Sequence, residues 1–249
     1  MRILLVADLH YSLRQLDWLK DTANRFDLVI IAGDLLDIAS IVPLEAQIIV
    51  VRKYLARLVE QAPLLVSSGN HDILYAGENE PRNAEWMQDK QGVTYSVDGD
   101  DFEQADLYFS TLPWWESDEQ RAAIEAQLQA QQTKAEGKRW IWIYHPPPKG
   151  TTVAWNGRRD FGDEYLPAWI ERFSPEMVLG GHIHNAPFYG DGSWIDQIND
   201  TWLFNSGMQT GSIPCFTVID TDENKAIWLS AAEGEQAQLT APLERKPLD

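Results

Sequence analysis

The sequence predicts an α/β fold in which two packed β-sheets are flanked by helices. Two observations support this. Through the first two thirds of the 249 residues, short apolar runs alternate with amphipathic stretches, which is typical of strands that pair in parallel through helical crossovers. In the final third the helical stretches stop, and short strands joined by turns follow.

Apolar runs mark the expected strands. They comprise, in order, residues 3–7, 28–31, 64–66, 93–97, 107–109, 140–144, 177–179, 202–204, 213–219 and 226–229. The first two runs are wholly apolar, as expected of strands buried on both faces. Asp191 and Gly192 form a dipeptide that predicts a hairpin.

Start and stop signals mark the expected helices. Ser12 with Gln15 and Ser117 with Gln120 each match a capping box. A proline at position 43 suits a first helical turn, and a glycine at position 137 suits a helix end. Helices are therefore predicted over residues 12–24, 43–60, 117–137 and 165–173.

Composition limits the possible partners. The chain carries 20 Lys and Arg against 38 Asp and Glu, a formal net charge of −18, which argues against binding of long nucleic acid. Cys215 is the only cysteine, so an internal disulfide and a cysteine-based metal cluster are excluded. Neither a signal peptide nor a membrane span is expected. We expect one cytoplasmic domain over residues 1–249, with a polar tail over about 233–249; the oligomeric state is left open.

Five of the apolar runs end in side chains that commonly bind metals. Run by run, these are Asp8 and His10; Asp34; Asn70, His71 and Asp72; His145; and His182 and His184. All five histidines of the chain are among them. Because sites in α/β sheets form at the carboxyl ends of strands, we expect these side chains to share one site.

The spacing and chemistry of these residues favour cations. In an extended chain, residues two apart such as Asp8 and His10, or His182 and His184, point to the same side. Oxygen and imidazole ligands without sulfur suit Mn, Fe, Co, Ni or Zn. Seven ligands are too many for one tetrahedral ion but suit two ions that share a carboxylate. Two divalent ions beside Asp8 and Asp34 leave a charge of about +2, which attracts a phosphate.

Together these motifs resemble the calcineurin-like metallophosphoesterase superfamily. The order is D-x-H, G-D, G-N-H-D, a histidine at a strand end and G-H-x-H, over residues 8–184. Asn205, Ser206 and Gly207 match a later turn of that family. The resemblance implies a four-layer α/β/β/α sandwich and a phosphoesterase with two divalent metal ions, for which Mn is favoured over Fe, Zn, Co or Ni.

The resemblance also implies residue roles. One ion would be held by Asp8, His10, Asp34 and His184. The other would be held by Asp34, Asn70, His145 and His182. His71 would face the substrate and stabilise the transition state, and Asp72 would orient His71 from behind. A hydroxide bridging the two ions would attack the phosphorus in line with the leaving group.

Loops near these residues offer candidate substrate contacts. Lys149, Arg158 and Arg159 either grip a charged group or are solvated surface charges. Trp155 shares their loop and either stacks on the substrate or packs internally. Tyr11 follows the D-x-H motif and is a candidate for the rim of the site.

Other aromatic and acidic residues have two interpretations each. Trp114 and Trp115 either stack on a ring of the substrate or fill the core. Trp140 and Trp142 alternate with isoleucines on one strand and are expected to be structural. Asp37 either supports a ligand histidine or serves a turn or helix cap.

The leading hypothesis is therefore a phosphoesterase acting on a small phosphorylated molecule, with a phosphodiester such as a cyclic nucleotide or a nucleotide conjugate preferred. A phosphomonoesterase or phosphoprotein phosphatase using the same site is the first alternative. A non-catalytic scaffold of the same fold is the second, but all the ligand positions are intact. A metal-storage protein would leave His71 and Asp72 without a role.

Overall fold

The structure is a computed structural model that describes residues 1–75, 81–90, 92 and 94–248. Within this part of the chain the larger of two sheets has seven strands, in the order β13-β12-β11-β10-β1-β2-β3. These strands are β1 (Arg2–Val6), β2 (Leu28–Ala32), β3 (Leu64–Ser67), β10 (Phe216–Asp220), β11 (Lys225–Leu229), β12 (Gly234–Gln238) and β13 (Arg245–Pro247). The first three are parallel, as the alternation of strands and helices predicts.

The second sheet has six described strands in the order β4-β5-β6-β7-β9-β8. They are β4 (Asp101–Gln104), β5 (Leu107–Thr111), β6 (Arg139–Ile143), β7 (Met177–Gly180), β8 (Ile195–Ile198) and β9 (Thr201–Asn205). β5, β6, β7 and β9 run parallel. The carboxyl ends of β6 and β7 therefore lie at one edge of this sheet.

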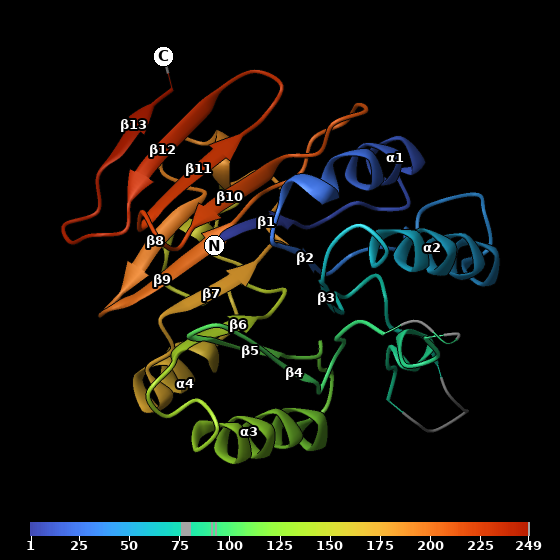
Figure 1. Cartoon of the computed structure of the whole chain (residues 1–249), viewed down its shortest axis with the longest axis horizontal. Coiled ribbons are helices and arrows are strands. Elements are labelled where there is room, and N and C mark those ends of the chain that lie inside the picture. Colours follow the sequence, from blue (N-terminus) through green and yellow to red (C-terminus); the bar gives the residue numbers. More distant parts are fainter. Residues whose placement is uncertain (76–80, 91, 93, 249) are drawn as a thin grey trace.

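Among the described residues, four α-helices cover the outer faces of the two sheets: α1 (Leu13–Thr22), α2 (Leu44–Leu58), α3 (Asp118–Gln132) and α4 (Leu166–Phe173). In Figure 1, α1 and α2 lie beside β1–β3, and α3 and α4 lie beyond β4–β7. Alternate residues of β1 reveal the layers, because Leu5 packs between the two sheets whereas Leu4 packs beneath α1 and α2. Trp140 and Trp142 are buried beneath α3 and α4, which confirms their structural role. The four-layer α/β/β/α sandwich is confirmed.

The helix starts follow the sequence signals unevenly. The capping box of Ser117 and Gln120 is present, with each side chain accepting from the other residue's N–H. The prediction of a capping box at Ser12 and Gln15 is wrong. The Ser12 side chain makes no capping hydrogen bond, and the buried Gln15 side-chain amide donates to the backbone carbonyl of Gln209. A long-range contact has replaced the local one. None of the helices in the described part of the chain is both long and apolar enough to cross a membrane.

Residues 234–238 and 245–247 form strands instead of the polar tail expected over 233–249. β12 pairs antiparallel with β11, and β13 pairs antiparallel with β12. Both strands lie at the sheet edge farthest from β3, and most of their side chains stay half-buried or exposed. A strand of this kind has no apolar run to mark it.

Two smaller expectations also differ from the structure. Asp191 and Gly192 lie in a turn that precedes β8, closed by the Gly192 N–H donating to the carbonyl of Tyr189, and do not join paired strands. In the strand expected over 93–97, Val93 lies outside the described residues, and Ser96 forms an isolated bridge. β4 was not expected at all, because its sequence is mostly polar.

Candidate metal centre

The ends of five parallel strands position the residues predicted to form the site. β1, β2 and β3 belong to the seven-stranded sheet, and β6 and β7 belong to the six-stranded sheet. The side chains after these strands meet between the two sheets. The Nε2 atoms of His10, after β1, and His184, after β7, lie 3.0 Å apart although 174 residues separate them in sequence. The predicted convergence of the strand ends is therefore present.

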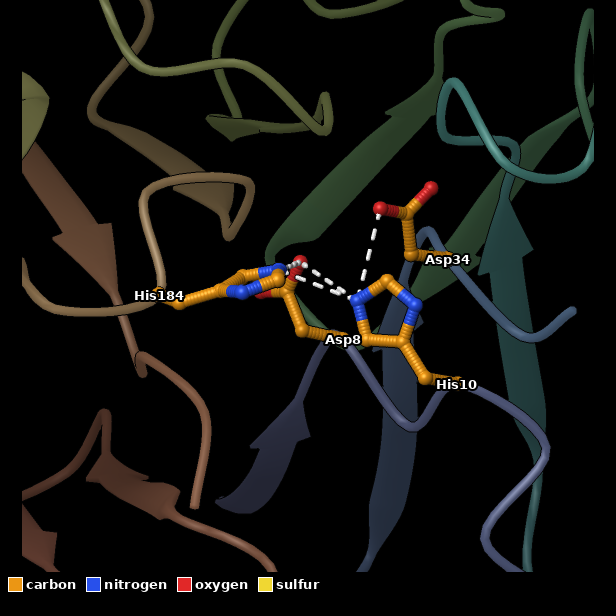
Figure 2. Close-up of side chains that lie close together, drawn as sticks. All are labelled: Asp8, His10, Asp34 and His184. Atoms are coloured by element: carbon orange, nitrogen blue, oxygen red, sulfur yellow. Dashed lines mark hydrogen bonds and ion pairs between the residues drawn. The ribbon is translucent and has the colours of Figure 1, made fainter. Parts of the chain in front are cut away.

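The first group of candidate ligands comprises Asp8, His10, Asp34 and His184. Each offers one ligand atom, and these atoms all lie within 4.8 Å of one another. Nε2 of His184 is 3.3 Å from Oδ1 of Asp8, and Nε2 of His10 is 3.7 Å from Oδ2 of Asp34. Figure 2 shows the His10 ring between the two carboxylates, with the His184 ring turned toward Asp8. Such a group can hold one divalent cation.

The second group comprises Asp34, His145 and His182, whose ligand atoms also lie within 4.8 Å of one another. Nε2 of His145 is 3.3 Å from Oδ2 of Asp34 and 3.9 Å from Oδ1 of Asp8. Because Asp34 belongs to both groups, its carboxylate lies where two cations could share it. This arrangement matches the shared carboxylate that the sequence predicts.

Two ligand atoms in this region are buried without a hydrogen-bond partner among the described residues. They are Nε2 of His145 and Oδ1 of Asn70. Buried polar atoms are nearly always paired, and an unpaired one costs about 1–3 kcal/mol. A cation would satisfy both atoms at once. Nitrogen and oxygen donors without sulfur fit the divalent transition metals, so the residues present fit two divalent cations.

The backbone at four of the seven candidate ligands is left-handed rather than extended. The φ angles are 54° at Asp8, 41° at His10, 55° at Asp34 and 70° at His182. L-residues adopt this region at a cost of order 1–3 kcal/mol, and such residues concentrate at functional sites. The prediction that extended backbone aligns each pair of ligands is wrong. Tight turns, rather than strand pleating, direct these side chains to the site.

Glycines allow the loops to approach each other. A Cβ atom on Gly33 would lie 2.3 Å from Nδ1 of His145, and one on Gly69 would lie 2.2 Å from Oδ1 of Asp34. Distances below 3.0 Å essentially never occur for real Cβ atoms. Any larger residue would push the ligands apart, which explains why glycine precedes Asp34 and Asn70.

A backbone carbonyl fixes the orientation of His145. Its Nδ1 lies 2.6 Å from the carbonyl oxygen of Ala32. Because a carbonyl can only accept, Nδ1 must carry a proton and donate it. Nε2 is then the atom that faces the carboxylates of Asp8 and Asp34. A second hydrogen bond of this kind is the usual way in which proteins orient a metal-binding histidine.

Neighbouring charges separate the pKa values within the cluster. Burial lowers the pKa of His145, but the carboxylates of Asp34 and Asp8 outweigh it and raise that pKa to about 9. Burial, together with the charge on His145, lowers the pKa of His182 to about 4. Burial opposes ionisation of Asp34, yet His145 holds the pKa of Asp34 well below its usual range. A cation must therefore displace a proton from His145 to bind there.

Comparison with known families identifies the chain. The model of the family described as calcineurin-like phosphoesterase matches residues 1–186. The chain belongs to this family. It is accordingly a metal-dependent phosphate ester hydrolase of a family that binds two metal ions, as the sequence predicts. No curated protein matches the sequence.

Solved structures share the fold of this phosphoesterase. The protein TT1561 of Thermus thermophilus is 15% identical with a TM-score of 0.60, over 99% of this chain and 98% of that one. A dimetal phosphatase from Danio rerio is 14% identical with a TM-score of 0.57, over 92% and 95%. Purple acid phosphatase PPD1 from yellow lupin (Lupinus luteus) seeds is 14% identical with a TM-score of 0.56, over 100% of this chain and 52% of that one. At these identities the likeness concerns the fold alone.

In this phosphoesterase, His71 lies beside the first group of candidate ligands. Its ring centroid is 4.4 Å from that of His10, and its backbone N–H donates to Oδ1 of Asp34 over 2.9 Å. His71 therefore adjoins the first group without belonging to it or to the second group. Ligand atoms of Asp37, His10 and His71 lie within 4.8 Å of one another, and the Asp37 carboxylate accepts from the N–H of Ala39, which confirms the turn interpretation. Support of a ligand histidine by Asp37 stays a prediction.

Asp72 does not contact the His71 ring as expected. It is fully buried, and its carboxylate accepts hydrogen bonds of 2.9 Å from the N–H groups of Leu35, Leu36 and Gly69. The bonds from Leu35 and Leu36 tie the loop after β2 to the loop after β3, and the bond from Gly69 braces the loop after β3 itself. The expected role in orienting His71 is wrong, because Asp72 holds together the backbone that carries Asp34 and Asn70.

The predicted basic substrate contacts contact residues of their own loop or are exposed. Lys149 pairs with Glu164 at 2.5 Å, Arg159 lies over the ring of Phe161, and Arg158 is exposed. No described ion pair joins these side chains to the candidate ligands. Exposed ion pairs contribute little to stability. The structure agrees with the alternative of solvated loop charges, and substrate binding by these residues stays a prediction.

The predicted aromatic contacts divide into two groups. Tyr11 packs against the apolar cluster beneath α1 and α2, and Trp155 is half-buried in the loop after β6. Trp114 instead packs against two candidate ligands, with its ring 5.2 Å from His182 and 5.9 Å from His145. Roles for Tyr11 and Trp155 at the substrate stay predictions, whereas Trp114 is placed at the centre itself.

A cavity of about 300 Å³ opens beside His182. Aromatic side chains form much of its wall, namely Trp114, Trp115, Phe161 and Tyr165. The sequence singled out the two tryptophans but not Phe161 or Tyr165. No local signal marks the latter pair, because they come from the far end of the loop that follows β6. Only the packing of this loop against the segment after β5 brings the four rings together.

Proposed function

We propose that this phosphoesterase holds two divalent cations at its strand ends and hydrolyses a small phosphate ester, with a phosphodiester preferred. Asp8, His10, Asp34 and His184 would hold one cation. Asp34, Asn70, His145 and His182 would hold the other. One observation carries this assignment: six of these side chains, from four strand ends, converge, and two of the proposed ligand atoms, Nε2 of His145 and Oδ1 of Asn70, are buried without a hydrogen-bond partner among the described residues.

Bound cations supply an activated water and neutralise charge that develops on the phosphoryl oxygens. The residues of the chain supply the rest. His145, oriented by the Ala32 carbonyl, presents Nε2 to the centre. His71 lies within reach of a substrate held there and would donate a hydrogen bond to the phosphoryl group or the leaving oxygen. Asp72 keeps the loops of Asp34 and Asn70 together by accepting hydrogen bonds from the N–H groups of Leu35 and Leu36.

Charge and space support a small substrate. Two cations beside the two carboxylates give the centre a charge of about +2, whereas the whole chain carries −18. The centre attracts one phosphate, while the remaining surface repels a long polyanion. The cavity beside His182 gives room for an organic arm of the ester, which favours an ester with an aromatic arm over inorganic or alkyl phosphates.

The identity of the metal ions is proposed from the chemistry of the donor atoms alone. The nitrogen and oxygen donors suit Mn²⁺, although Fe, Zn, Co and Ni accept the same set and availability decides among them. The cytoplasmic location expected from the sequence stays a prediction.

Metal content and turnover test the proposal. Elemental analysis of the Mn²⁺-loaded protein should find two ions per chain. Hydrolysis of bis-p-nitrophenyl phosphate should exceed that of p-nitrophenyl phosphate, because the diester is preferred. Asn70→Ala should reduce kcat/KM for the diester by at least about tenfold, since even residues behind a metal ligand matter by 10–100-fold. His71→Ala should reduce kcat by roughly 10²-fold or more, the usual contribution of an acid–base group.

A matched substitution separates these effects from general damage. Asn24 is exposed, lies beyond α1 and is not a candidate ligand. Asn24→Ala should retain full activity and both metal ions. Absence of turnover with every divalent metal tested would contradict the proposal. Full activity in Asn70→Ala would contradict the ligand assignment even if the protein hydrolyses esters.

A further inference from the structure

We infer that the cavity beside His182 is a specificity pocket for a neutral, planar ring carried by the phosphate ester, and that it rejects anionic arms. This inference rests on the proposed function, because the phosphate must be held at the cations for its organic arm to enter the cavity. It adds the chemical class of that arm, which neither the family nor the candidate ligands specify.

The cavity is continuous with the metal centre. His182 is a candidate ligand and also forms part of the cavity wall. The Trp114 ring lies 5.2 Å from the His182 ring, so one indole borders both the centre and the cavity. A group attached to a phosphate at the centre would therefore leave it directly against aromatic surface.

Size and lining favour a ring. The volume of about 300 Å³ lies at the lower end of the range for small-ligand sites. Indole, phenyl and phenol rings line it. Aromatic walls bind planar rings by offset or edge-to-face packing, and stacking accepts any base because every base has a π-face.

Hydrogen bonds hold the wall in place. Nε1 of Trp115 donates to the Tyr144 hydroxyl over 2.8 Å and to Oδ2 of Asp163 over 3.1 Å. The Tyr144 hydroxyl donates to the same Asp163 oxygen over 2.5 Å. Tyr165 packs edge-on against Trp115, with ring centroids 5.5 Å apart. A preformed wall of this kind lowers the entropy lost on binding.

Charge excludes an anionic arm. No Lys or Arg is among the described residues that line the cavity, whereas Asp163 and Glu164 are. Three basic residues contact the wall from outside the lining: Arg121 over Tyr165 and Arg159 over Phe161, and Lys149 through Glu164. Arg121 is also paired with Asp118 and Glu125. Inside the cavity, a second phosphate or a carboxylate on the arm would meet the carboxylates of Asp163 and Glu164.

Phosphonates with a single arm test the inference, because each has only one group that can enter the cavity. Binding of methylphosphonate, phenylphosphonate and 4-carboxyphenylphosphonate to the Mn²⁺-loaded protein is measured by isothermal titration calorimetry. We expect phenylphosphonate to bind at least about fivefold more tightly than methylphosphonate, the low end for one stacked ring. We expect 4-carboxyphenylphosphonate to bind no more tightly than methylphosphonate, because its carboxyl group would abolish the advantage of the ring.

Alanine variants of cavity residues test whether the preference for phenylphosphonate arises in this cavity. Phe161 and Tyr165 are each 39% exposed, so their replacement by alanine is tolerable for folding. Phe161→Ala and Tyr165→Ala should each reduce the ratio of the two dissociation constants toward one. Phe188 is a matched control, since it is 38% exposed and lies outside the cavity lining. Phe188→Ala should preserve the ratio.

The outcomes are distinct. Equal binding of the methyl and phenyl compounds, or tighter binding of the carboxyphenyl compound, overturns the pocket while leaving the metal centre intact. Failure of all three phosphonates to bind overturns the proposed centre, and the pocket with it. If the ratio of the dissociation constants for methylphosphonate and phenylphosphonate falls equally in Phe161→Ala and Phe188→Ala, the preference for the phenyl ring does not arise in this cavity and the inference is overturned.

Discussion

Replacing Gly69 by alanine tests how closely the loops after β2 and β3 must approach. The new Cβ would lie 2.2 Å from Oδ1 of Asp34 and 2.6 Å from its backbone nitrogen. Rotation of the Asp34 side chain relieves the first contact but not the second. Restoring an ordinary contact of 3.4 Å with that backbone nitrogen, now at 2.6 Å, requires a displacement of about 0.8 Å between the loop that carries Asp34 and the loop that carries Asn70.

The magnitude follows from this displacement. Overpacking of a tight contact typically costs about 1–3 kcal/mol, which for a chain of this size lowers Tm by about 2–12 °C. A misplacement of about 1 Å at a catalytic centre reduces the rate by about 10²-fold. We therefore expect Gly69→Ala to lose about 10²-fold in kcat/KM for bis-p-nitrophenyl phosphate and to unfold at a lower temperature.

Thermal unfolding and Mn²⁺-dependent turnover measure both effects. Gly190 provides a control, because it is exposed and no atom lies within 4 Å of its Cβ position. Gly190→Ala should match the unsubstituted protein in Tm and in kcat/KM. If Gly69→Ala retains activity within about twofold and Tm within about 2 °C, the low end of the expected shift, the two loops are not held at the separation described, and the reasoning is refuted.

Four further predictions concern the same centre. Asn70→Ala removes a buried oxygen that has no hydrogen-bond partner among the described residues. The metal-free variant should therefore keep its Tm, while its affinity for the Mn²⁺ held by Asn70 falls at least about tenfold. A fall in the Tm of the metal-free variant together with the fall in affinity would contradict this. The pKa of His145 is raised to about 9, so Mn²⁺ affinity should rise with pH up to about 9 as the competing proton is lost, and a flat titration by calorimetry would contradict this. The same raised pKa stabilises the metal-free fold fully below about pH 6.5, and this contribution is lost as the pH rises toward about 9. Chelation should lower Tm, and added Mn²⁺ should restore it in a concentration-dependent way, whereas an unchanged Tm in calorimetric scans would show that the cations do not bind the folded chain preferentially.

Burial decided which strands the sequence could reveal. β2 is buried along its whole length, so hydrophobicity alone marks it. β12 reads Gly-Glu-Gln-Ala-Gln with a single buried residue, and β4 is also largely polar. Both are edge or near-edge strands that exist because a neighbour offers free backbone groups. Such pairing partners are distant in sequence, so a local pattern cannot predict them.

The candidate ligands were predictable, but their geometry was not. Residues that end buried strands meet at sheet edges, which is why six of the seven predicted ligands fall into the two groups described. The turns that aim Asp8 and His182 depend on contacts with other loops, such as the His182 N–H donating to the Asp8 carboxylate. The backbone role of Asp72 was hidden for the same reason, because its three donors come from two separate loops.

The division of the ligands between the sheets also orders events along the chain. His145, His182 and His184 follow strands of the six-stranded sheet, whereas the carboxylates follow strands of the other sheet. Neither proposed cation position would have its full ligand set in one half of the molecule alone. In a nascent chain both sets would therefore be complete only after residue 184 has been synthesised and the halves have docked. Binding of both cations would then report that the two halves have come together.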